Sequence, residues 1–345
     1  MIGDRIKLKR NANRESLQMV SDHLANSGYN ITYVTLSNYE NGKTIPTNET
    51  LKVLGEHLGV SSSFFTDTRW DNLEIFCYNV EFSTSKRDVE LNSYLRVAQE
   101  QHLSLDLALN IAPAIPNIAR THVTKYDFNV IEQVAFDFRQ HNGAGTLPIS
   151  SICNLLESIG WYLYELPKSF GYSSISGYSS NPSNLFLAYV ANDRVDELRF
   201  ELLKAVGYSY FDSNDSNVLE KTVEGFARAV LLPVANLSSE IGSSRKRISY
   251  PELTILKQKY GMSRIKIAKR LHELGLMTDE DYQLTLNDLK KHGFPLVRGL
   301  PYEMLAFNEQ PLKLKQKVLR ARAEGVLNEM QSLQYYPFEL YDLFE

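Results

Sequence analysis

The sequence predicts a mainly helical protein with a small β component: a five-helix N-terminal domain, then an α+β domain, then a helical C-terminal extension. Two observations support this prediction. Apolar residues recur at the three- and four-residue spacing of amphipathic helices along most of the 345 residues. Short apolar runs of the strand type occur near residues 75–82, 161–166 and 185–191. A chain of this length has room for two or three domains.

The composition excludes several classes of protein. Hydrophobic residues make up 43% and charged residues 23% of the chain, as in globular proteins. No apolar run reaches 18 residues, and the N-terminus lacks the core of a signal peptide, so we expect no membrane span. Cys77 and Cys153 form no CxxC pair, which fits a reducing compartment. We therefore expect a cytoplasmic protein.

The first 66 residues have the pattern of a small helical domain. Ser16 is a predicted N-cap, Pro46 separates the third and fourth helices, and Gly59 ends the fourth. Thr47 or Asn48 is expected to cap that fourth helix. Three helices of this domain are predicted at residues 4–11, 16–25 and 49–58, and Phe64 and Phe65 are expected to close its core.

Residues 31–43 are the most informative stretch, because their pattern is that of the recognition helix of a helix-turn-helix. Thr32 is its predicted N-cap, Leu36 and Tyr39 face inward, and Gly42 stops the helix. The side chains left facing outward at the helix start are those that we expect to read base edges: Tyr33, Val34, Ser37 and Asn38.

The residue types at these positions suit double-stranded DNA. Asn38 can make a bidentate contact with adenine, and Val34 can pack on a thymine methyl group. Phosphate contacts are predicted for Arg10, Ser16, Asn41 and Lys43. Residues 1–66 hold seven Lys and Arg against six Asp and Glu, while the whole chain has a net charge of −4. Such a weak local charge favours site-specific binding as a homodimer over general attraction to nucleic acid.

The order Ser-Asn-Tyr-Glu-Asn-Gly-Lys over 37–43, followed by Ile-Pro-Thr over 45–47, resembles the XRE/Cro repressor family. The resemblance covers residues 2–66. It implies a lambda-repressor-like fold and a dimer that binds an operator, expected to be an inverted repeat.

The remaining chain is predicted to divide into a connector at 67–125, a domain at 126–280 and the helical extension at 281–345. The connector holds a possible strand at 75–82 and a long amphipathic helix at 89–110. This helix is interpreted either as a linker packed on the next domain or as a dimerisation helix. In the extension, the main helix is expected at residues 312–331.

Within residues 126–280, the predicted order is two helices, a strand, a hairpin or surface loop, a strand and further helices. The helices are expected at residues 130–140, 149–159, 195–211, 218–231, 252–260 and 264–274, with the hairpin or loop at 171–184. The last pair has the pattern of a second helix-turn-helix, but the family resemblance described next implies that it forms the closing helices of this domain.

This order, with Leu-Pro at 147–148 and Arg-Phe-x-Leu at 199–202, resembles the ImmA/IrrE family of zinc-dependent metallopeptidases over about residues 126–275. The resemblance implies a zincin-like domain whose helix carries an HExxH zinc motif. This chain departs from that motif at every ligand position and at the base: Lys204, Ala205, Tyr208 and Thr222. Glu220 and Glu224 are expected to point to other helix faces. We therefore predict no catalytic residue, no metal there and no cofactor.

A cleft that has lost its chemistry can still bind a ligand or partner. Candidates for its lining are Lys204, Tyr208, Tyr172 and Tyr178. The alternative is that these side chains fill a purely structural core.

Together these patterns predict a transcriptional repressor of the mobile-element or phage type. Its second domain would sense an inducer, which could be an antirepressor protein, a peptide or a small molecule. One alternative is an antitoxin-like interaction protein that regulates its own operon. Another is an active zinc peptidase.

Overall fold

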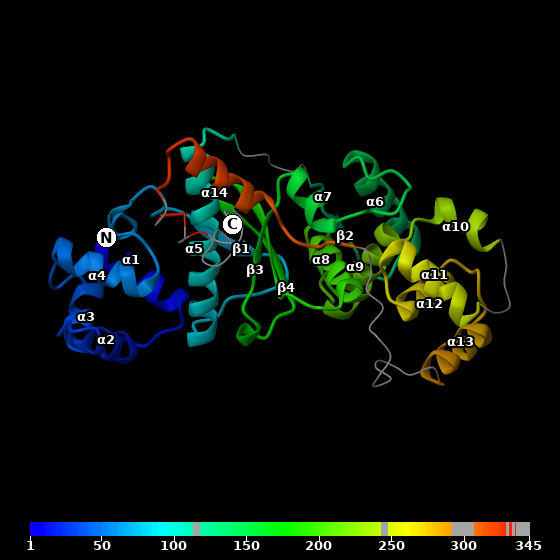
Figure 1. Ribbon diagram of the computed structural model, residues 1–345. Coiled ribbons are helices and arrows are strands. Elements are labelled where there is room, and N and C mark those ends of the chain that lie inside the picture. The colour runs from blue at the N-terminus through cyan, green and yellow to red at the C-terminus, as the bar shows by residue number, and fades with distance from the viewer. Residues whose placement is uncertain (113–117, 243–247, 292–306, 329–330, 333–334, 336–345) are drawn as a thin grey trace. The chain divides into compact units, whose positions relative to one another are not determined.

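The computed structural model describes residues 1–112, 118–242, 248–291, 307–328, 331–332 and 335. The chain is mainly helical with a small amount of sheet (Figure 1). It forms two compact units, the first of residues 1–114, 178–186 and 312–345, and the second of residues 115–177 and 187–311. The four predicted segments do not map one-to-one onto these units, because the helix at 86–108 packs on the first helix of the chain and the helix at 313–323 packs on the helix at 86–108.

The N-terminal domain has four α-helices and one 3-10 helix in place of five α-helices. Their bounds are α1 Ile2–Ala12, α2 Leu17–Asn26, α3 Tyr33–Glu40, α4 Asn48–Leu58 and η1 Ser62–Thr66. The predicted caps are confirmed: Ser16, Thr32 and Thr47 each accept a hydrogen bond from a backbone N–H three residues ahead. The core lies between these helices and contains Ile6, Val20, Leu24, Leu36, Leu51, Leu54, Leu58 and Phe65.

Helix α5 (Lys86–Ala108) connects the N-terminal domain to the rest of the first unit. It packs against α1 and against α14 (Lys313–Ala323), which lies beside it in Figure 1. The buried Arg5 guanidinium is 2.8 Å from the Glu100 carboxylate, so an ion pair joins α1 to α5. These contacts differ from the interpretation of this helix as a linker packed on the next domain, because they join α5 to α1 and α14 within the first unit. Its role in dimerisation stays a prediction.

The larger sheet has four strands in the order β1-β4-β5-β3. They are β1 Glu74–Cys77, β3 Tyr162–Glu165, β4 Ser174–Ser180 and β5 Asn184–Tyr189. A parallel pair joins β2 (Thr121–His122) to β6 (Phe211–Asp212). Residues 171–184 are therefore part of a hairpin and not a surface loop. Strand β1 is shorter than the predicted strand at 75–82.

The helices of the second unit largely follow the predicted pattern. They are α6 Phe128–His141, α7 Ile152–Ser158, α8 Val195–Tyr210, α9 Ser216–Leu231, α10 Val234–Ile241, α11 Tyr250–Tyr260, α12 Arg264–Glu273 and α13 Asp279–Lys291. Helix α7 begins later than predicted because Ser151 caps it. Helix α10, which begins directly after Pro233, was not predicted.

Helix α14 is shorter than the helix predicted at 312–331. It ends at Ala323, just before Gly325 takes a left-handed conformation (φ +72°) that closes the helix end. Residues 329 and 330 of that prediction lie outside the described residues. Across the described part of the chain, no helix combines the length and apolarity needed to cross a membrane.

Candidate DNA-binding interface

The recognition helix α3 is fixed at both ends by local hydrogen bonds. The Thr32 hydroxyl accepts from the Thr35 backbone N–H at 3.2 Å, which satisfies one of the free donors of the first turn. Gly42 has a positive φ of +67°, and the backbone N–H of Lys43 donates to the Asn38 carbonyl at 2.9 Å. Leu36 is 1% exposed and holds the inner face of the helix in the domain core.

The predicted base-reading residues lie on the outer side of this helix. Tyr33 and Val34 are 52% and 50% exposed, a large apolar exposure in the first turn of a short helix. Ser37 and Asn38 are half-buried one turn further on. The turn after α3 adds Ile45, which is 81% exposed and which helical spacing did not single out. Apolar and amide side chains in this arrangement can meet thymine methyl groups and base edges in a major groove.

Two of the predicted phosphate contacts directly follow this helix, and a third lies at the start of α2. Lys43 is exposed in the turn after α3. Asn41 is exposed, and its amide donates to the Ser37 carbonyl at 2.8 Å. The Ser16 hydroxyl caps α2 by accepting from the Met19 backbone N–H at 3.1 Å. Free N–H groups at the start of such a helix favour an anion.

Arg10, the fourth predicted phosphate contact, already has protein partners. Its guanidinium binds both carboxylate oxygens of Glu40, at 2.6 and 2.8 Å, and donates to the Glu15 carbonyl at 2.7 Å. Arg10 therefore ties α1 to the last residue of α3. Its phosphate contact stays a prediction, and the geometry first gives it a role in positioning the recognition helix.

Residues 26–65 match the helix-turn-helix family model. The N-terminal part of the chain is a helix-turn-helix domain. The match begins at the last residue of α2 and includes α3 and α4. Helix-turn-helix domains place their recognition helix in the major groove, so the match supports a DNA-binding transcription regulator. No curated protein and no solved structure matches the chain.

In the second unit, the predicted cleft residues Lys204 and Tyr208 come together on one face of α8. The Lys204 ammonium is 2.5 Å from one carboxylate oxygen of Glu220, and the Tyr208 hydroxyl donates to the other. The prediction that Glu220 points to another face is therefore wrong. Thr222, which the resemblance to the metallopeptidases puts at the third ligand position, is fully buried.

The close packing of α8 on α9 explains this correction. Gly207 allows the approach, because a Cβ atom there would lie 3.0 Å from the Val223 Cβ atom. This contact sets the register of the two helices, and the register brings Glu220 opposite Lys204 and Tyr208. Glu224 instead lies 3.5 Å from Arg228 of its own helix.

The group of Lys204, Tyr208 and Glu220 neutralises its own charge. Burial alone would raise the pKa of Glu220, but hydrogen bonds from Lys204 and Tyr208 hold it below its usual range. Burial lowers the pKa of Lys204, but its hydrogen bond to Glu220 and the surrounding carboxylates outweigh this and raise it. Burial and the contact with Glu220 raise the pKa of Tyr208. The lysine therefore stays cationic at a position where the resembled family has a zinc ligand.

The other two predicted cleft residues, Tyr172 and Tyr178, stay predictions. Tyr172 is half-buried in the second unit. Tyr178 belongs to the first unit, where its ring stacks on Phe76 with a centroid distance of 5.0 Å. The contacts that the structure describes at the candidate cleft are those among Lys204, Tyr208 and Glu220.

Proposed function

We propose that this chain is a sequence-specific transcriptional repressor of the XRE type. The observation that carries the proposal is the recognition helix, whose first turn exposes Tyr33 and Val34 while Leu36 on its inner face belongs to the domain core. An exposed apolar first turn on a rigid helix is what direct readout of thymine methyl groups requires. Asn38 is the residue to which we assign adenine recognition.

The proposed repressor acts as a homodimer on an inverted repeat. A single small domain with little net positive charge makes few phosphate contacts, so affinity requires a second copy. The two half-sites are then expected one helical turn apart, or a multiple of it.

For the second unit we propose a sensing role in place of catalysis. The support is the group of Lys204, Tyr208 and Glu220, in which an ammonium group neutralises the nearby carboxylate. A zinc peptidase needs three protein ligands and an open position for water. The Lys204 ammonium group would repel Zn²⁺ from this position. An inducer that binds this unit relieves repression if it binds the DNA-free form more tightly than the DNA-bound form.

The test of DNA binding is a nuclease footprint of the full chain on the DNA flanking its own gene, at several salt concentrations. The wild type is compared with Asn38→Ala and with Asn217→Ala, an exposed asparagine on α9 of the second unit. We expect a protected inverted repeat with wild type and Asn217→Ala. Asn38→Ala is expected to lose about 1–3 kcal/mol of binding free energy and selectivity at one base pair.

Two outcomes contradict this proposal. Equal protection and equal sequence preference for Asn38→Ala would mean that α3 does not read bases in the assigned orientation. No protection at any salt concentration would contradict the proposal that the chain is a repressor. It would favour an antitoxin-like interaction protein, which co-purification with a toxic partner would identify.

A further inference from the structure

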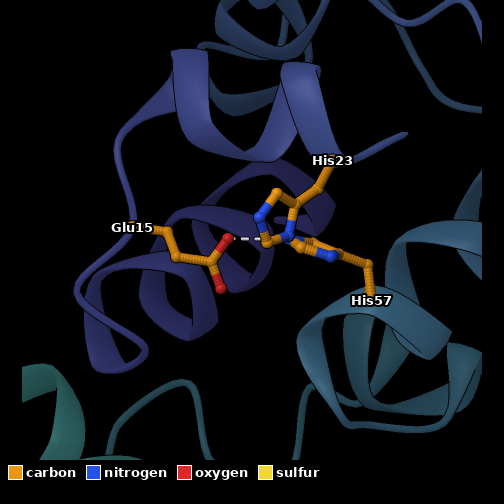
Figure 2. A group of neighbouring side chains, drawn as sticks. All are labelled: Glu15, His23 and His57. Carbon is orange, nitrogen blue, oxygen red and sulfur yellow. Dashed lines mark hydrogen bonds and ion pairs between the residues drawn. The ribbon is translucent and has the colours of Figure 1, made fainter. Parts of the chain in front are cut away.

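Three side chains of the N-terminal domain that are not among the predicted DNA contacts lie close together. Glu15 lies in the connection between α1 and α2, His23 is on α2 and His57 is in the last turn of α4. Figure 2 shows the carboxylate and the two imidazole rings turned toward one small space. One ligand atom from each of the three lies within 4.8 Å of the others.

The contacts within this cluster already orient its ligand atoms. The Nε2 atom of His57 is 2.7 Å from a Glu15 carboxylate oxygen, and the two imidazole rings meet edge to face with centroids 5.0 Å apart. The side chains of His57 and Glu15 are 14% and 15% exposed, which limits their motion. The His23 residue is exposed, so one side of the cluster is open to solvent.

We propose that Glu15, His23 and His57 form a binding site for a divalent transition metal, with Zn²⁺ as the ion that fits it. Two imidazoles and one carboxylate are a recurrent zinc ligand set, with a water in the fourth position. Bonds of about 2.0–2.2 Å in tetrahedral geometry place ligand atoms about 3.4 Å apart. The His57 and Glu15 ligand atoms, 2.7 Å apart, need to move slightly apart. Rotation of the exposed His23 side chain can bring its imidazole nitrogen closer to them.

The three ligands come from separate segments, so the metal would act as a cross-link. It would join α4 to α2 and to the α1–α2 connection, the elements that hold the recognition helix. An unfolded chain does not bring these residues together, so bound metal stabilises the folded domain by linkage. This inference does not rest on the proposed repressor function, since it concerns metal binding by the domain itself.

The test measures Zn²⁺ bound to the full chain by equilibrium dialysis, together with the visible absorption of the Co²⁺-substituted protein. Wild type is compared with His23→Gln, His57→Gln, the double variant and His141→Gln, an exposed histidine of α6 in the second unit. We expect one Zn²⁺ per chain, tetrahedral Co²⁺ bands and a higher midpoint of thermal unfolding with metal. Each single substitution should lower the affinity for Zn²⁺ by at least about 10-fold, because even the mutation of residues that only hydrogen-bond to metal ligands lowers metal affinity by about 10–100-fold. His141→Gln should bind like wild type.

Two results would overturn the site. One is a wild-type chain that retains no zinc after dialysis, which would leave Glu15 and His57 as a hydrogen-bonded pair. The other is unchanged binding by the double variant, which would place the metal elsewhere in the chain. His23 is exposed, so His23→Gln is expected to keep the circular dichroism of the folded protein and separates lost ligation from lost folding.

Discussion

Arg10 and Glu40 are the residues through which the first helix holds the recognition helix. Their side chains are 12% and 6% exposed and meet through two short hydrogen bonds. Removing one partner leaves a largely buried charge, so we expect Arg10→Ala and Glu40→Ala each to lower the free energy of unfolding by about 3 kcal/mol. The double variant should lose less than the sum of the two.

This cycle is measured by urea unfolding in a Trp161→Phe background, so that the fluorescence comes from Trp70, which lies in the same compact unit. Operator binding by Glu40→Ala then separates the two roles of Arg10. If the two costs simply add, the pair does not couple α1 to α3, and the phosphate contact becomes the better account of Arg10.

Glu309 is a second residue whose role is structural and long-range. Its carboxylate accepts from the backbone N–H groups of Ile152 and Cys153 at 2.9 and 2.8 Å, at the start of α7. It also pairs with Arg199, and both side chains are almost fully buried. We expect Glu309→Ala to lower the free energy of unfolding by about 3–5 kcal/mol, because it leaves Arg199 as an uncompensated buried charge.

Glu309→Gln should cost less, since its amide oxygen still accepts from the helix N-terminus. Unfolding is followed through the fluorescence of Trp161, which is buried in the second unit. Glu280→Ala, at an exposed acidic residue of α13, is the control. Equal stability of Glu309→Ala and wild type would contradict the stabilising role of Glu309 in the second unit.

The contrast between these residues shows what the sequence could predict at this scale. Ser16, Thr32 and Thr47 were found as caps because the donor and acceptor are three residues apart and residue type alone identifies them. Glu309 caps a helix more than 150 residues away and belongs to no local pattern. For the same reason the cluster of Glu15, His23 and His57 was not predicted, because the spacing of these residues in the sequence matches no metal motif.

At the scale of elements, helix starts and ends were predictable where caps, glycines and prolines mark them, as in α2, α3, α4 and α9. The orientation of α9 against α8 was not, because it depends on a tight contact at Gly207 that single-sequence periodicity does not contain. The resemblance to the metallopeptidases puts the third ligand position at Thr222, whereas the structure has Glu220 opposite Lys204 and Tyr208.

This arrangement predicts that two substitutions create a zinc site between these helices. Lys204→His with Tyr208→His puts two imidazoles four residues apart on the face of α8 that meets Glu220. Together with that carboxylate they form a two-histidine, one-carboxylate ligand set. We expect the variant to gain one tightly bound Zn²⁺ when it is made together with His23→Gln and His57→Gln, which remove the proposed N-terminal site.

Adding Glu220→Gln to this variant is the matched control and should lose the gained zinc, because an amide is a poor zinc ligand. A variant that binds no zinc, although it is folded by circular dichroism, would show that positions 204, 208 and 220 lack the geometry of a metal centre. It would also remove the support for the resemblance to zinc peptidases.

At the scale of the whole molecule, the two tryptophans allow each compact unit to be followed by itself. Trp70 lies in the first unit, where its indole N–H donates to the Ser104 hydroxyl at 2.9 Å, and Trp161 lies in the second. Trp161→Phe and Trp70→Phe therefore give chains that report one unit each. Different unfolding midpoints in the two chains would show that the units unfold independently.

The first unit is predicted to lose stability in acid through His102, which is buried on α5. Burial, reinforced by the charges of Lys317 and Lys313 on α14, lowers the pKa of His102 to about 3, against 6.5 for an exposed histidine. Below pH 6.5 the unfolded chain takes up a proton at this residue and the folded chain does not. The stability that His102 contributes is therefore complete above pH 6.5 and falls by about 1.4 kcal/mol per pH unit as the pH drops from there toward 3.

At pH 5 this amounts to about 2 kcal/mol, which urea unfolding of the Trp161→Phe chain at pH 7 and pH 5 can resolve. His102→Gln cannot take up the proton, so its loss of stability between the two pH values should be smaller than that of wild type by this amount. His141→Gln, at an exposed position, should behave like wild type. Because α5 contacts both α1 and α14, a confirmed difference would mean that acid weakens the packing that carries the helix-turn-helix domain. Equal pH dependence of wild type and His102→Gln would instead assign the acid sensitivity to other residues of the unit.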